Sequence, residues 1–245
     1  MSTYTPQNAV DLVKDFAHGV AISDNSAAWM CDIIHSMMWT FYPWSWTISS
    51  LTPITLVDGT QDYTPTNTDI LRPTLLRIAR TDVTPNEARE LALLSNLGVE
   101  LTRKGGLDTI TACGILSTGA IRLNYAASVG IGQVLQLQGF YQKTPTAITK
   151  DLMQTPFSFP DYYFNVFVEG LKWQFYTFAD DQRAGSASYS KNGSMTRQYN
   201  GYYAVFTDAL LTMARTEDLK GGDEFMFPEQ SLGNGRSYWP GLYGL

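Results

Sequence analysis

Apolar residues recur at helical spacing in the N-terminal part of the chain. Thr5 followed by Pro6 is typical of a helix start, and the apolar pattern after it fits a short helix. A second pattern starts at Ser23 or Asp24 and repeats every three to four residues up to Pro43. Proline cannot donate a backbone hydrogen bond, so Pro43 ends this helix. The pattern predicts two amphipathic helices.

From Trp44 to about residue 145 the pattern changes to alternation, with β-branched residues between turn formers. Asp58-Gly59 separates two such runs, and this dipeptide favours the turn of a β-hairpin. One helix is expected inside this region, over about 85–97, because Thr84 and Glu87 form a capping-box pattern before an apolar run. We therefore predict a β domain with one short helix.

Helical spacing returns after Pro160 and continues to Asp180 and Asp181. A further helix is expected over about 186–215, although Gly193 and its neighbours make its first half a weak helix former. Two C-terminal helices are thus predicted.

The last stretch, 218–245, is rich in glycine and has no sustained period, which is typical of a segment without its own fold. It also carries aromatic side chains that suit anchoring in pockets of another subunit. We predict an extended arm whose partner-binding residues are Phe225, Phe227, Tyr238, Trp239 and Tyr243.

The predicted fold class is α+β. A helical bundle of two N-terminal and two C-terminal helices is expected over 1–43 and 146–217. An antiparallel β-sandwich or barrel-like domain over 44–145 is inserted between them, and the arm follows over 218–245.

Three of the six tryptophans lie where the second helix gives way to the β domain. Trp44 and Trp46 share one face if the chain after Pro43 is a strand, and Trp39 lies near the end of the helix. We interpret these three residues as packing between the two domains.

The charge balance is acidic, with 17 Lys and Arg against 23 Asp and Glu and a net charge of −6. This argues against a protein that holds nucleic acid by releasing counterions. Seven basic residues nevertheless fall within 72–122, where solvated strand faces are the simple interpretation and a surface for an acidic partner is the alternative. No apolar run approaches the length of a membrane span, so no membrane partner is expected.

No catalytic motif is present, and we predict no enzymatic activity, no cofactor and no metal site. The two cysteines, Cys31 and Cys113, are interpreted as small buried residues. His18 is expected near a helix end and His35 on the polar side of the second helix.

Several motifs occur in a characteristic order: MWTFYPWSW, then LRPTLLRIAR, GAIRLNY, GFYQKTP and finally a helix ending in Asp-Asp. In this order they resemble the head-to-tail adaptor proteins of tailed bacteriophages, of the tail tubular protein A or neck connector type. The matching residues are Trp44, Trp46, Tyr63, Arg77, Ile121, Leu123, Tyr141, Lys143, Pro145, Asp180 and Asp181.

The resemblance implies a structural virion protein that is made in the host cytoplasm and assembles at the neck. Such adaptors form a ring, usually of twelve copies, between the portal protein and the tail or nozzle protein, and DNA passes through without sequence-specific binding. An acidic charge suits such a channel.

Two alternatives stay open. A tail-completion or terminator protein would have the same composition but would bind the end of the tail tube. A glycan-binding or cell-wall-degrading tail protein would use exposed tryptophans to stack on sugars.

Overall fold

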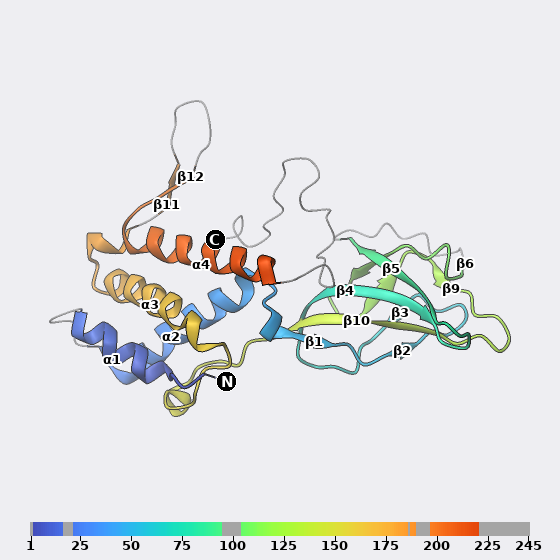
Figure 1. Cartoon of the computed structure of the whole chain (residues 1–245), viewed down its shortest axis with the longest axis horizontal. Helices are drawn as coiled ribbons and strands as arrows, with labels where there is room; N and C mark the ends of the chain where they lie inside the picture. The colour runs from blue at the N-terminus through green and yellow to red at the C-terminus, as the bar shows by residue number, and fades with distance from the viewer. Residues whose placement is uncertain (1, 17–21, 95–103, 186, 190–196, 221–245) are drawn as a thin grey trace. The chain divides into compact units, whose positions relative to one another are not determined.

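The computed structural model describes residues 2–16, 22–94, 104–185, 187–189 and 197–220 (Figure 1). Contacts divide the chain into two compact units. The first, here called the helical unit, combines Met1–Trp46 with the chain from Pro145 onward, and the second, the sheet unit, is Thr47–Thr144. The chain therefore leaves the helical unit once, builds the sheet unit and returns.

Four α-helices lie in the described part of the helical unit. They are α1 (Pro6–Phe16), α2 (Asp24–Phe41), α3 (Phe164–Phe178) and α4 (Gly201–Lys220). Short 3-10 turns occur at η1 (Ser45–Thr47), η2 (Lys150–Leu152), η3 (Asp161–Tyr163) and η4 (Gln182–Ala184), and β11 (Ala187–Tyr189) pairs with β12 (Arg197–Tyr199). Helix α3 contacts each of the other three helices, as Figure 1 illustrates.

Local signals explain where these helices begin and how closely they pack. The hydroxyl of Ser23 caps α2 by accepting a hydrogen bond from the Ser26 N–H at 3.2 Å. Gly170 lets α3 approach two neighbours, because a Cβ there would lie 2.7 Å from the ring of Phe206 and 2.8 Å from Ile34. The core of this unit is thus centred on α3.

One large sheet forms most of the sheet unit. Its order is β1-β10-β4-β5-β7-β8-β3, with β2 also pairing β10. The strands are β1 (Ile48–Ser50), β2 (Ile54–Thr55), β3 (Asp62–Tyr63), β4 (Ile70–Arg80), β5 (Glu87–Leu93), β7 (Ala112–Ile115), β8 (Ile121–Leu123) and β10 (Leu135–Lys143). Two further short strands, β6 (Lys104–Gly105) and β9 (Ala126–Ala127), form a parallel pair.

The predicted fold class is wrong. The chain is a mixed α/β protein in which a large curled sheet dominates one unit, and it is not a helical bundle carrying an antiparallel sandwich or barrel (Figure 1). Strands β5 and β7 are parallel, so the main sheet is mixed. The alternating pattern within a strand does not predict whether its neighbour runs parallel or antiparallel. Parallel neighbours also need a long connection between them.

The helix expected over about 85–97 is also wrong where the structure describes it. Residues Glu87–Leu93 form β5, which pairs with β4 on one side and β7 on the other. The register sets Arg77 opposite Glu90 and Arg80 opposite Glu87, so the charges of the two strands complement each other. Pairing on both edges overrides a sequence that reads locally as a helix.

Two smaller expectations need correction. Asp58-Gly59 does form a turn with Gly59 at a φ of +77°, but β2 pairs with β10 and β3 with β8, so no hairpin forms there. The helix expected from 186 begins only at Gly201, because β11 and β12 precede it. The predicted helices at α1, α2 and α3 are confirmed.

Candidate functional site

The tryptophans around Pro43 lie in the helical unit. Trp44 is fully buried, Trp39 is buried and Trp46 packs against the same core. The rings of Trp39 and Trp46 meet edge to face at 5.1 Å, and those of Trp44 and Trp46 are parallel at 6.1 Å. These ring contacts are internal to the helical unit, and the role of the three tryptophans between domains stays a prediction.

The reason given for the shared face of Trp44 and Trp46 is wrong. The chain at Ser45–Thr47 is a 3-10 turn rather than a strand, so alternation does not apply. The turn brings the two rings together, and the indole N–H of Trp44 donates to the carbonyl of Met38 at 2.6 Å. The cluster thus fixes the end of α2.

His35 belongs to the same aromatic cluster, so its expected place on the polar side of α2 is wrong. Its ring lies edge to face with Trp39 at 5.3 Å, and it is 4% exposed. Burial lowers the pKa of His35 to about 4, and the nearby charge of Asp32 only partly opposes this. The Nδ1 of His35 and the Nε1 of Trp46 are buried without a hydrogen-bond partner. His18 lies outside the described residues.

A buried carboxylate holds the end of α4. Glu217 is 6% exposed and accepts hydrogen bonds from the hydroxyls of Tyr163 and Ser45, the latter at 2.8 Å. The next residue, Asp218, accepts one from the hydroxyl of Tyr42. Burial first, and then the carboxylate bonds, raise the pKa of both tyrosines. These contacts fix the point from which the C-terminal stretch departs.

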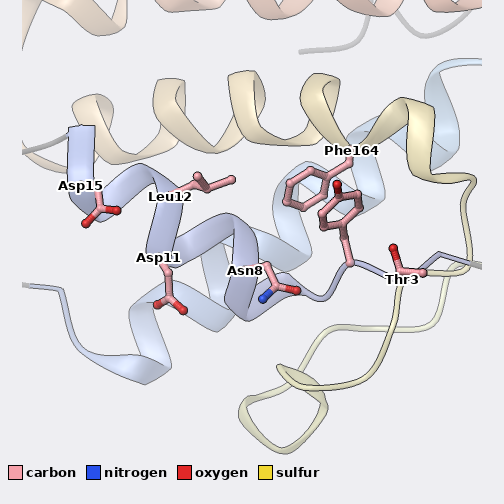
Figure 2. A pocket seen from close by; sticks show the side chains of 7 residues that line it. Thr3, Asn8, Asp11, Leu12, Asp15 and Phe164 are labelled. Atoms are coloured by element: carbon pink, nitrogen blue, oxygen red, sulfur yellow. The ribbon is translucent and has the colours of Figure 1, made fainter.

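A shallow groove of about 420 Å³ lies between α1 and the start of α3 (Figure 2). The ring of Tyr4 stacks on Phe164 at 4.1 Å, and Leu12, which is 42% exposed, extends toward Phe164. Asp11 and Asp15 follow one another at a spacing of four along α1, so they lie on one side of the helix. The groove therefore has an apolar floor and an acidic rim.

Asp161 positions the N-terminal segment that forms one end of the groove. Its carboxylate accepts hydrogen bonds from the Ser2 hydroxyl and from Thr3, through the Thr3 N–H at 2.8 Å and its hydroxyl at 2.9 Å. The Ser2 hydroxyl first, and then the Thr3 N–H, hold the pKa of Asp161 below its usual range. Reciprocal hydrogen bonds between Thr5 and Asn8 then start α1.

The other residues that carry the family resemblance serve mainly structural roles. Tyr63, Ile121, Leu123 and Tyr141 are buried in the core of the sheet unit. Arg77 is exposed on β4 and donates to Gln138 at 3.2 Å. Asp181 caps η4 and pairs with Arg183 at 2.6 Å, which lowers the pKa of Asp181 to about 2.

The first residues of the predicted arm, 218–220, are the end of α4, and the rest of the arm lies outside the described residues. Its anchors Phe225, Phe227, Tyr238, Trp239 and Tyr243 lie outside the described residues. Within the described part of the chain, no group of three or more His, Cys, Asp or Glu side chains is placed to hold a metal ion. In that same part, no helix has the length and apolar character needed to cross a membrane.

The groove between α1 and α3 was not predicted. Its residues come from both chain segments of the helical unit, and only the spacing of Asp11 and Asp15 and the adjacent exposed Leu12 signal it in the sequence. No protein-family model matches the chain, and no curated protein is significantly similar to it. The resemblance to phage adaptors therefore rests on the motifs themselves.

Proposed function

We propose that the protein is a structural component of a phage virion, a head-to-tail adaptor that forms a ring beneath the portal protein. The observation that carries this proposal is the motif order from MWTFYPWSW to the Asp-Asp helix end. Several motif residues, such as Trp44 and Tyr141, are buried in the cores of the two units. Residues that stabilise the fold suit a protein whose proposed role is structural.

The proposed role assigns different tasks to different parts of the chain. The arm after α4 contacts the portal protein or a neighbouring subunit through a few aromatic anchors. Glu217 supports this, because its hydrogen bonds to Ser45 and Tyr163 give the arm a fixed point of departure. The ring joins a tail or nozzle protein on its other side.

DNA passes through the proposed ring without being held. The net charge of −6 supports this part of the proposal, since like charge keeps the phosphate backbone from binding the wall. No enzymatic step and no cofactor enter the proposed role.

Electron microscopy of the purified full chain mixed with portal protein tests the proposal. An adaptor gives rings or caps on portal particles, with the rotational symmetry of the portal. Binding to the end of isolated tail tubes instead would identify a tail-completion protein. Binding or turnover of cell-wall glycan without ring formation would identify the glycan-binding alternative, and either result would overturn the adaptor proposal.

A further inference from the structure

We propose that the groove between α1 and α3 binds the chain's own C-terminal segment, residues 236–243. The inference does not depend on the adaptor role, because it concerns the isolated chain. It rests on three observations: the chemistry of the groove, the charge of the segment and the point at which α4 ends.

The groove is an exposed apolar surface with the carboxylates of Asp11 and Asp15 beside it. Leu12 and the stacked rings of Tyr4 and Phe164 form its floor (Figure 2). Among the described residues, neither Asp11 nor Asp15 forms an ion pair, and Asp11 only accepts a hydrogen bond from Gln7 at 2.7 Å. Such a surface fits a segment that combines a cation with aromatic rings.

Only one part of the C-terminal stretch has that composition. Arg236 is the single basic residue after Lys220, and Tyr238 and Trp239 follow it closely. The other aromatic pair, Phe225 and Phe227, is flanked by Asp223, Glu224 and Glu229. Like charges would repel that pair from Asp11 and Asp15, so charge complementarity selects the Arg236 end.

The end of α4 places this segment within reach of the groove. Glu217 is hydrogen-bonded to Tyr163, and the next residue, Phe164, lines the groove. An extended chain spans about 3.3 Å per residue, so residues 221–235 can cover about 50 Å. A tether of this length gives an effective concentration of about a millimolar, so binding within one chain prevails over binding between chains in dilute solution.

In the free protein, the groove would therefore hide two of the predicted partner-binding residues, Tyr238 and Trp239. Tyr238 and Trp239 occupy the groove until a partner with higher affinity takes them. Binding to that partner then leaves Leu12 and the Tyr4–Phe164 stack exposed.

Photocrosslinking of the full chain tests this. Trp239 is replaced by p-benzoylphenylalanine, which keeps an aromatic ring, and the crosslinked peptides are mapped by mass spectrometry. The expected result is a crosslink to the groove residues, within 3–15 or at Phe164, inside one chain, with a yield unchanged over about a hundredfold dilution. Crosslinks between two chains, crosslinks to another segment or the lack of any crosslink would overturn the proposal. The same probe at Phe225 is the matched control and should leave these groove residues unlabelled.

Charge substitutions test the recognition itself. Asp11→Asn with Asp15→Asn should lower the yield about fivefold, as should Arg236→Gln, and the two changes together should lower it no further because they remove the same interaction. Asp208→Asn, at an exposed position on α4, is the control and should have no effect. An unchanged crosslinking yield in the Asp11 and Asp15 variant would contradict the assigned contact. So would a combined variant whose loss of yield is the sum of the two separate losses.

Discussion

The hydroxyl of Tyr163 donates a hydrogen bond to the buried carboxylate of Glu217, which joins η3 to the last turn of α4. Ser45, just beyond α2, donates to the other oxygen of the same carboxylate. Three segments far apart in sequence thus share one acidic group. A buried carboxylate is tolerated where its oxygens receive donors, as they do here.

Replacing this carboxylate should destabilise the helical unit. Glu217→Ala removes the acceptor of two hydroxyls, and Tyr163 is left with a buried donor that has lost its carboxylate, which costs about 1–3 kcal/mol of unfolding free energy. Glu217→Gln keeps one acceptor oxygen and should cost less. Urea unfolding followed by tryptophan fluorescence is the measurement, because five of the six tryptophans lie in the described part of the helical unit and none lies within residues 47–144. Equal stability of the Ala variant and the native chain would contradict a structural role for Glu217.

Stability of the helical unit should depend on pH through His35. Burial lowers its pKa from 6.5 to about 4, so between these values the unfolded chain binds a proton that the folded chain does not. The contribution of His35 to the unfolding free energy is therefore fully present above pH 6.5. It is lost as the pH drops toward 4, by about 3 kcal/mol in all.

The variant His35→Phe isolates this effect, since all other titratable groups are the same in both proteins. The native chain should lose more unfolding free energy than the variant between pH 7 and pH 4, by about 3 kcal/mol. The measurement is again urea unfolding by tryptophan fluorescence at each pH. Parallel pH profiles of the two proteins would show that His35 is not the titrating group.

Local signals in the sequence account for the first two helices but not for the sheet order. Thr5, Ser23 and Pro43 act within a turn of their own position, so the bounds of α1 and α2 can be predicted from short stretches. The strand β5 depends on register with β4 and β7, and its capping-box pattern points to the wrong element. Pairing between distant strands is a tertiary property that a local pattern does not encode.

The same distinction applies to the candidate sites. The aromatic cluster at Trp39, Trp44 and Trp46 can be predicted because it is contiguous in sequence. The groove requires Phe164 to meet Tyr4, and the Glu217 site requires Tyr163 to meet the end of α4, so both depend on how α3 packs. Burial of His35 likewise depends on Phe159, from a segment that returns after the sheet unit.

Adding one methyl group at Gly170 should weaken the core around α3. The Cβ of Gly170→Ala would lie 2.7 Å from Phe206 and 2.8 Å from Ile34, and both are fully buried. Overpacking of this kind costs about 1–3 kcal/mol, although alanine favours the helix itself. Thermal unfolding followed by tryptophan fluorescence measures the loss. Gly106→Ala, where a Cβ would meet no atom within 4 Å, is the control; it lies in the sheet unit, which has no tryptophan, so its thermal transition is followed by circular dichroism and should be unchanged.

Removing the arm should separate attachment from folding. Deletion of residues 225–245 takes away the five predicted anchors but leaves α4 and the hydrogen bonds of Glu217 intact. The truncated protein should therefore keep the urea unfolding midpoint of its helical unit to within a few tenths of a molar, since the described core around α3 is formed by residues within 9–214. Its attachment to portal-bearing capsids, measured by co-sedimentation, should be lost.

A chain in which only Phe225 and Phe227 are changed to Ala should show which aromatic pair carries the attachment, because anchors dominate such interfaces. Attachment that survives the full deletion would show that the arm is not part of the interface. The contact would then have to be made by the rest of the chain.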